Sequence, residues 1–228
     1  MNLFEQAWYL ITTYNVPGSF WVNIQLTFWA GLGALVIGTV MGLMRVAPVS
    51  SLQWLGTSYV TVFRNMPLTV IMLLGIQAIW GQLKITLASD FYLNFFVYAA
   101  LGLALYHAAF VCEAVRSGIN TVPLGQAEAA RAIGLSFLPA ARIVLLPQAF
   151  RGAIAPLGNV LIALIKNSTV AAAASVATET SSVMKTMIDQ NGNSVVLIFL
   201  LFAIGYVILV VPVGVVTTAL SRRLAVAR

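Results

Sequence analysis

The chain contains 228 residues, of which 61% are hydrophobic and only 8% are charged, and its formal net charge is +6. A soluble domain carries about 25% charged residues, so this chain lacks the polar side chains that would cover a soluble core. The composition excludes a soluble globular protein and indicates an integral membrane protein. The basic excess does not indicate nucleic-acid binding, because the basic residues lie at the ends of hydrophobic segments and form no cluster.

Several stretches contain no Asp, Glu, Lys or Arg and are long enough for a helix to cross a bilayer, which takes about 20 residues. They are residues 6–44, 65–83, 91–112 and 190–221. Their apolar residues run continuously instead of alternating, which favours helices over barrel strands. We predict an all-α polytopic protein, one transmembrane domain over residues 1–228 with five spans, at about 20–44, 52–80, 91–116, 153–176 and 195–220.

The first predicted span ends where Arg45 and Pro48 come close together, because proline cannot continue a helix. Its glycines predict close packing against a neighbouring helix, and they are Gly31, Gly33, Gly38 and Gly42. The second span carries the sequence Arg64-Asn65-Met66-Pro67 in its early part.

The third span contains the only acidic residue of the predicted spans, Glu113. Arg116 follows three residues later on the same helix face, so we predict a structural ion pair between the two. His107 and Asn94 are weaker candidates for contact with a transported molecule, because an interior histidine is more often a satisfied structural group.

The connection from about residue 117 to residue 150 is the only loop between spans that is large enough to hold structure of its own. We predict a short helix from Leu124 to Ile133 that ends at Gly134, and a second one from Pro139 to Leu146 that Pro147 stops. One face of this pair is more apolar than a solvated loop requires. Either the pair packs on its own protein or it docks on another one.

The fourth span is interrupted by Lys166, Asn167, Ser168 and Thr169. No acidic residue lies within four positions of Lys166, and the polar residues after it compete with the backbone for hydrogen bonds. A broken helix here would offer free N–H groups to a substrate carboxylate. The alternatives are a lysine that reaches the membrane surface and a break that only serves packing.

The positive-inside rule predicts the orientation of the spans. Only Lys84 and Lys185 lie in loops on one side, with Lys166 inside a span. Nine arginines lie on the other side, namely Arg45, Arg64, Arg116, Arg131, Arg142, Arg151, Arg222, Arg223 and Arg228. The C-terminus and the 117–150 loop are therefore predicted to be cytoplasmic, and with five spans the N-terminus is outside.

The cytoplasmic loop carries a specific motif. The residues Glu128, Ala129, Ala130, Gly134, Val144, Leu146 and Pro147 follow the spacing of the EAA loop in permease subunits of ATP-binding-cassette (ABC) importers, with valine in place of isoleucine at position 144. Further similarity to polar amino-acid importer permeases, of the histidine, glutamine and glutamate type, lies in 63–68, 113–119, 146–149, 156–159 and 166–168. The chain most resembles permeases of actinobacterial glutamate importers.

The resemblance implies a type I ABC importer permease fold in a bacterial plasma membrane. It implies a translocation path for glutamate, glutamine or aspartate, and an EAA loop that couples this path to partner ATPases. The implied partners are a homologous permease subunit in a homodimer or heterodimer, two cytoplasmic ATPases and an extracytoplasmic binding protein.

The sequence contains no phosphate-binding G-x-x-x-x-G-K-[ST] motif and no metal-ligand cluster. We therefore expect no enzymatic activity, catalytic residue, metal or cofactor in this chain itself, and expect ATP and Mg²⁺ on the partner ATPases. The alternatives are a secondary transporter or channel, a subunit for another polar amino acid, and a membrane-embedded assembly or signalling subunit without a transport path.

Overall fold

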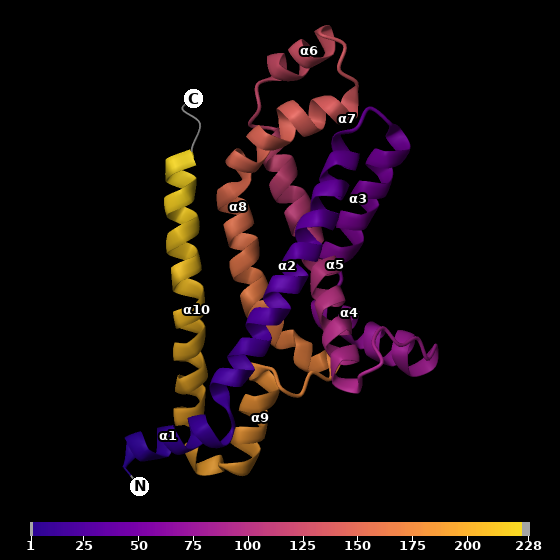
Figure 1. The fold of residues 1–228 in the computed structure, drawn as a ribbon. Helices are drawn as coiled ribbons and strands as arrows, with labels where there is room; N and C mark the ends of the chain where they lie inside the picture. The colour runs from indigo at the N-terminus through magenta and orange to yellow at the C-terminus, as the bar shows by residue number, and fades with distance from the viewer. Residues whose placement is uncertain (1, 225–228) are drawn as a thin grey trace. The chain divides into compact units, whose positions relative to one another are not determined.

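A computed structural model describes residues 2–224, and every regular element in this range is helical. Figure 1 shows the long helices α2, α5, α8 and α10 together with shorter ones. In chain order the helices are α1 (Leu3–Thr13), α2 (Val16–Val46), α3 (Ser50–Asn65), α4 (Leu68–Leu73), η1 (Leu74–Gln82), α5 (Phe91–Ile119), α6 (Leu124–Ala132), α7 (Phe137–Ala140), η2 (Ala141–Leu145), α8 (Leu146–Asn167), η3 (Ser168–Ala174), α9 (Thr180–Gln190), η4 (Gly192–Ser194) and α10 (Val195–Leu224). The segments η1 and η2 are π-helical, and η3 and η4 are 3₁₀-helical.

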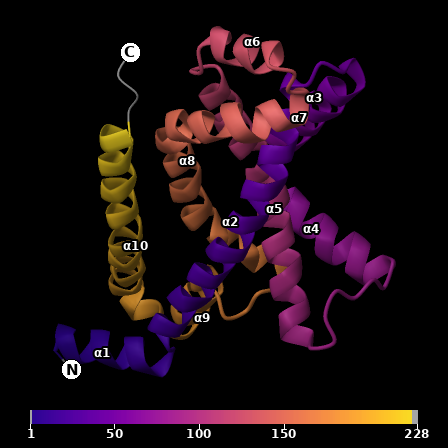
Figure 2. The ribbon, with the colours of Figure 1, turned by 45° about the horizontal axis from the view of Figure 1, so that its top comes forward.

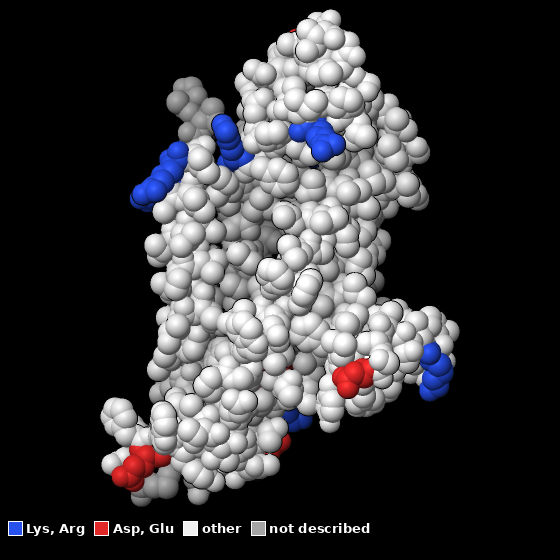
Figure 3. Space-filling view, viewed as in Figure 1, with Lys and Arg blue, Asp and Glu red and all other residues white. Residues whose placement is uncertain are grey.

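Four helical segments of the described chain are long and apolar enough to cross a membrane, and a bent pair of helices makes a fifth if it counts as one span. The four are Val16–Val46, Phe91–Ile119, Phe137–Ala174 and Gly192–Leu224. Charged side chains are sparse on the face of the molecule in Figure 3. The predicted all-α polytopic fold class is confirmed. Arg228, one of the basic residues used to predict orientation, lies outside the described residues.

The second predicted span is not one continuous helix. Its two parts, Ser50–Asn65 and Leu68–Gln82, meet at an angle of 100°. Pro67 has no backbone N–H to donate, and it holds the preceding Met66 in an extended conformation with φ −90° and ψ 129°. The helix therefore breaks at Met66 and changes direction.

The prediction that Pro147 stops a short helix is wrong. Helix α7 begins at Phe137, before Pro139, and η2 then leads directly into α8, which contains Pro147 in its first turn. A proline ring normally clashes with the carbonyl four residues earlier, and the wider π-helical turn of η2 just before Pro147 relieves that clash. The fourth long segment consequently extends well before residue 153.

The chain folds into two compact units, each assembled from three separate stretches of sequence. The first unit comprises Met1–Ala30, Leu68–Leu103 and Ala163–Pro212. The second comprises Gly31–Pro67, Ala104–Ile162 and Val213–Arg228. Neither unit is a continuous segment of the chain, because the long helices contribute residues to both.

In the first unit, α1, α9 and α10 share a hydrophobic core. The buried residues of this core are Leu10, Val16, Met187, Ile198 and Phe202. The Phe20 ring of α2 packs on the Phe202 ring, with 5.7 Å between their centroids. Figures 1 and 2 both show α1 crossing beside the start of α10.

In the second unit, α2 and α5 approach each other closely. A β-carbon placed on Gly38 would lie 2.6 Å from the Ala108 carbonyl oxygen and from the Val111 side chain, and one on Gly42 would lie 3.3 Å from Val115. The predicted role of these glycines in close helix packing is confirmed at Gly38, because no larger residue fits there without a shift of the neighbouring helix.

Candidate functional site

A buried polar network joins four elements of the first unit. The side-chain amide of Asn23 on α2 donates to Ser168 Oγ at 2.8 Å and to the Tyr206 hydroxyl at 3.1 Å. Its oxygen accepts the backbone N–H of Thr180 at 3.0 Å, and the Thr180 hydroxyl lies 2.5 Å from the Tyr206 hydroxyl. Asn23, Ser168 and Thr180 are each no more than 2% exposed. The network therefore fixes α2, η3, α9 and α10 relative to one another within this unit.

Glu179 extends the network and caps α9. Its carboxylate accepts the backbone N–H groups of Ser181 at 2.8 Å and Ser182 at 2.5 Å. Burial of this carboxylate raises its pKa, and the two backbone hydrogen bonds oppose that rise. A completely buried acidic side chain is here held by a helix N-terminus, which favours negative charge.

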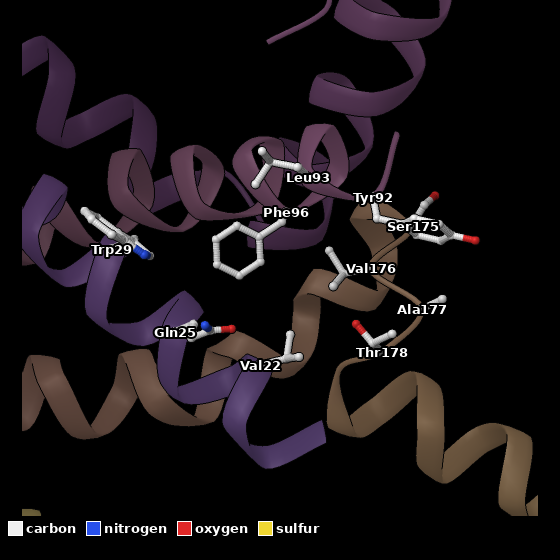
Figure 4. A pocket seen from close by; sticks show the side chains of 10 residues that line it. All are labelled: Val22, Gln25, Trp29, Tyr92, Leu93, Phe96, Ser175, Val176, Ala177 and Thr178. Atoms are coloured by element: carbon white, nitrogen blue, oxygen red, sulfur yellow. The ribbon is translucent and has the colours of Figure 1, made fainter. Parts of the chain in front are cut away.

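A pocket of about 370 Å³ lies in the same unit (Figure 4). Several of its lining residues are close in the sequence to residues of the polar network. Three elements line it, and the lining residues are Val22, Gln25 and Trp29 from α2, Tyr92, Leu93 and Phe96 from α5, and Ser175, Val176, Ala177 and Thr178 from the segment before α9. Figure 4 shows Gln25, Phe96 and Val176 directed toward a common space. The lining offers hydroxyl and amide groups within aromatic and aliphatic walls, which suits a small polar molecule with an apolar part.

Ser175 gives this pocket an unusual backbone. Its φ of 63° and ψ of 26° place it in the left-handed region, which residues with a β-carbon seldom adopt. The residue ends η3, and its N–H donates to the carbonyl of Ala172 at 3.0 Å. Such strained positions concentrate at binding sites, and this one directs the 175–178 segment along the pocket wall.

The four polar residues predicted to break the fourth span have different surroundings. Lys166 is exposed near the end of α8, and its carbonyl accepts the Thr169 hydroxyl at 2.8 Å. Asn167 is the last residue of α8, after which the helix tightens into η3. Ser168 is completely buried in the polar network. Thr169 lines a second pocket of about 300 Å³ together with Thr180 and Tyr206.

The two candidates on α5 are both buried. His107 is 1% exposed, and its ring lies 5.1 Å from the Tyr106 ring and 6.3 Å from the Phe110 ring, centroid to centroid. Asn94 accepts the backbone N–H of Leu87 at 2.8 Å and that of Ala88 at 3.3 Å, so it holds the loop that precedes α5.

Glu113 contacts three arginines in the second unit. Arg116 Nε lies 3.2 Å from its carboxylate, as predicted from their spacing, and two further arginines join the pair. Arg45 of α2 lies at 2.6 Å and Arg64 of α3 at 3.5 Å. Arg64 also lies over the Phe110 ring, 5.6 Å from its centroid. The sequence showed Arg45 and Arg64 only as signals of orientation, although Glu113 was the single acidic residue available within the predicted spans.

The predicted loop motif runs from α6 through Gly134 and the half-buried Val144 of η2 to the start of α8 (Figure 2). Glu128, Ala129, Gly134 and Pro147 are exposed, Ala130 is buried, and Leu146 packs partly buried against the Ala108 and Val115 cluster. Gly134 has a φ of 86°, which creates the bend between α6 and α7. Large apolar side chains around the bend are exposed, namely Leu124, Ile133, Leu138 and Ile143.

Residues 34–226 match the family described as the binding-protein-dependent transport system inner membrane component. The chain belongs to this family. It is a permease, a membrane-embedded translocation component that is not itself an enzyme, and the family implies ATPase and substrate-binding partners.

Relatives of the permease include transporters of acidic amino acids. It is 46% identical to the glutamate transport system permease protein GluC of Corynebacterium glutamicum, over 91% of this chain and 93% of the relative. It is 36% identical to the glutamate/aspartate import permease protein GltJ of Escherichia coli, over 73% of this chain and 71% of the relative. Among solved structures, an amino acid ABC transporter crystallised with histidines matches with a TM-score of 0.78 at 25% identity, covering 98% of this chain and 99% of the other.

The structure adds functional candidates that sequence reasoning missed in the permease. The pocket residues Ser175 and Thr178 and the capping residue Glu179 follow the predicted break directly, yet they have no motif of their own. The available signal was Glu179, an isolated acidic residue among small and hydroxyl side chains between two apolar segments.

Proposed function

We propose that this permease carries glutamate inward across a bacterial plasma membrane as the transmembrane subunit of an ABC importer. The observation that carries this proposal is the 46% identity to a glutamate permease over nearly the full length of both chains. Glutamine and aspartate are the nearest alternative substrates, since relatives named for glutamate/aspartate and for glutamine also match over most of this chain.

In this proposal the substrate uses the pocket of the first unit. Its volume of about 370 Å³ suits a molecule of amino-acid size, and its lining combines Gln25 and Thr178 with aromatic walls. Lys166, Asn167, Ser168, Thr169 and His107 remain the predicted path residues. Of these, Ser168 bonds directly to Asn23, which lies on the same helix as the pocket residues Val22 and Gln25.

The loop of the second unit is proposed to couple transport to ATP hydrolysis. Its exposed apolar side chains around Gly134, such as Ile133 at 78% exposed and Leu138 at 65%, would be covered in a groove of a partner ATPase. Two such ATPases bind ATP and Mg²⁺, and this chain binds no cofactor. A second permease subunit and an extracytoplasmic binding protein complete the assembly. The basic residues of the sequence support a cytoplasmic loop and C-terminus and an N-terminus outside.

The proposal is tested by uptake of labelled amino acids into vesicles that contain the complete complex. We expect competition for glutamate uptake by unlabelled glutamate to exceed competition by glutamine, arginine and histidine. Preferred uptake of a cationic amino acid would refute the assignment of substrate.

The Lys166→Met variant tests the path residues in the same assay, with Lys185→Met on α9 as a matched control because Lys185 is also exposed. If Lys166 binds the side-chain carboxylate of glutamate, the variant weakens glutamate transport far more than glutamine transport, by roughly 1.5–3 kcal/mol. Equal weakening of both substrates indicates that the α-carboxylate is bound there. Unchanged transport of both removes Lys166 from the path.

A further inference from the structure

Helix α1 lies outside residues 34–226, which match the family, so the family likeness assigns it no role. Its position is fixed within the first unit by contacts with the first turn of α10 and the residue before it. Gln6 Nε2 donates to Ser194 Oγ at 2.6 Å, and Leu10 belongs to the same buried cluster as Ile198 and Phe202. The candidate span Gly192–Leu224 begins at this level. Helix α1 therefore lies beside the beginning of that candidate span.

The side chains of α1 divide into three faces at 100° per residue. The core face contains Leu10, which is 1% exposed. One flank carries Phe4 and Trp8, which lie one turn apart and are 88% and 69% exposed. The opposite flank carries Thr13 and Tyr9, both exposed. An exposed helix with a core face between an apolar flank and a more polar flank is suited to lie flat at a boundary between lipid and water.

The only charged side chain of α1 is directed to its own helix terminus. Glu5 accepts the backbone N–H of Asn2 at 3.1 Å, while the Asn2 side chain accepts the Glu5 N–H at 2.8 Å, which forms a capping box. The Phe4 and Trp8 flank thus carries no charge that would have to enter an apolar environment. Aromatic residues of this kind gather at membrane–water interfaces.

Helix α10, which packs against α1, also exposes apolar side chains near its beginning. In the first unit, the part of α10 that follows Ser194 exposes Val196, Phe199 and Leu200 at 73%, 60% and 48%. Because α10 belongs to a candidate membrane span, its exposed Val196 and Leu200 are suited to contact lipid, whereas Phe199 also lines the second pocket. We propose that α1 lies in the membrane–water interface with Phe4 and Trp8 inserted among the lipids of the nearer leaflet. The helix then anchors the beginnings of α2 and α10 at a fixed depth.

A docking protein is the other possible occupant of this flank, and the experiment separates the two. In a Cys112→Ala background, which removes the only cysteine of the chain, single cysteines replace Phe4, Trp8 or Thr13. Each carries a nitroxide spin label, and the full complex is reconstituted in vesicles of phosphatidylethanolamine and phosphatidylglycerol. Collision of the label with oxygen, which concentrates in lipid, is compared with collision with a water-soluble nickel complex. The thermal unfolding midpoint of each variant confirms that it is folded.

We expect labels at positions 4 and 8 to collide several-fold more with oxygen than with the nickel complex, and the label at position 13 to show the reverse. Position 4 keeps the test decisive if Trp8→Cys fails to fold, because Phe4 is the more exposed of the two. Equal exposure of positions 4 and 13 to the nickel complex would overturn the proposal. So would nickel access at positions 4 and 8 that is lost only when the extracytoplasmic binding protein is added, because the flank would then be a protein docking surface.

Discussion

One acidic side chain holds together parts of the chain that are far apart in the sequence, and another caps a helix beside the buried polar network. Glu113 of α5 contacts Arg45 of α2 and Arg64 of α3 as well as its neighbour Arg116. Glu179 caps α9 and connects to the buried hydroxyl of Thr180 at 3.3 Å. In apolar surroundings a charged or polar group must have hydrogen-bonding or charged partners. Removing one partner therefore lowers the free energy of unfolding by more than the hydrogen bond itself contributes.

Replacing Glu113 by glutamine should destabilise the permease by roughly 1.5–3 kcal/mol, because three arginines lose their common carboxylate and the hydrogen bonds to Arg45 and Arg116 lose their charge. Thermal unfolding of the purified complex in detergent measures this effect. Asp189→Asn is the matched control, since Asp189 is exposed on α9. Equal midpoints for the two variants would show that the cluster contributes nothing to stability.

Glu179 should make stability depend on pH. Burial raises its pKa in the folded protein, whereas an unfolded glutamate has a pKa of about 4.3. Between these two values the folded state binds a proton that the unfolded state has released, so the stability from this group falls as pH rises through that window. Glu179→Gln cannot titrate, and its unfolding midpoint should lack this decline. If the unfolding midpoints of the unsubstituted permease and of Glu179→Gln changed in parallel from about pH 4 to about pH 8, Glu179 would not be the source of the pH dependence.

At the scale of the elements, the interruptions of the helices place the functional candidates. Met66 and Pro67 turn the chain by 100° between α3 and α4. At Ser168, α8 tightens into η3, which brings the Ser168 hydroxyl to Asn23 and leads into the strained Ser175 of the pocket. At Gly134, a left-handed residue turns α6 back toward α7. Each interruption therefore sets the direction of the segment that follows it.

Replacing Gly134 by valine should reduce substrate-stimulated ATP hydrolysis while the protein stays folded in the membrane. A β-carbon at Gly134 meets open space, so only its φ of 86° makes valine unfavourable there. Gly125→Val is the matched control, because Gly125 on α6 also faces open space but has no positive φ. We expect the control to keep most of the stimulation. Equal activity of the two variants would contradict a coupling role for this bend.

At the scale of the whole molecule, each compact unit draws on three stretches of the chain, and each contains one part of the proposed machinery. The pocket and polar network belong to the first unit, and the Glu113 cluster and coupling loop to the second. The long helices α2, α5, α8 and α10 contribute residues to both units. The proposed substrate site and the proposed coupling loop are therefore connected by helices that are continuous in sequence.

Uptake by the complete complex should depend on ATP and not on an ion gradient. An ATPase subunit with an inactivating substitution should abolish uptake, and ionophores that collapse proton and sodium gradients should leave initial rates within about twofold. The sequence offers only Glu113 within the predicted spans to bind a coupling ion, and three arginines already surround it. Uptake that persists without active ATPase but stops with ionophores would establish the alternative of a secondary transporter.

The sequence alone was sufficient for the membrane class, the helical fold and the family. Long uncharged stretches can satisfy their backbone groups in lipid only as helices, so composition decides this level. The loop motif around Glu128 and Gly134 could also be recognised in the sequence, because its spacing is local and glycine at position 134 tolerates a left-handed backbone. The same local reasoning identified the pairing of Glu113 with Arg116, which are one helical turn apart.

Only the tertiary structure decided which distant residues meet. Asn23, Ser168, Thr180 and Tyr206 come from four separate elements, and no local pattern predicts that their side chains share hydrogen bonds. The pocket likewise depends on how α2, α5 and the 175–178 segment pack, and Pro147 continues a helix because η2 widens before it. Local sequence governs backbone conformation through steric and hydrogen-bonding limits, whereas contacts between distant residues depend on the packing of whole helices, which no short window of sequence contains.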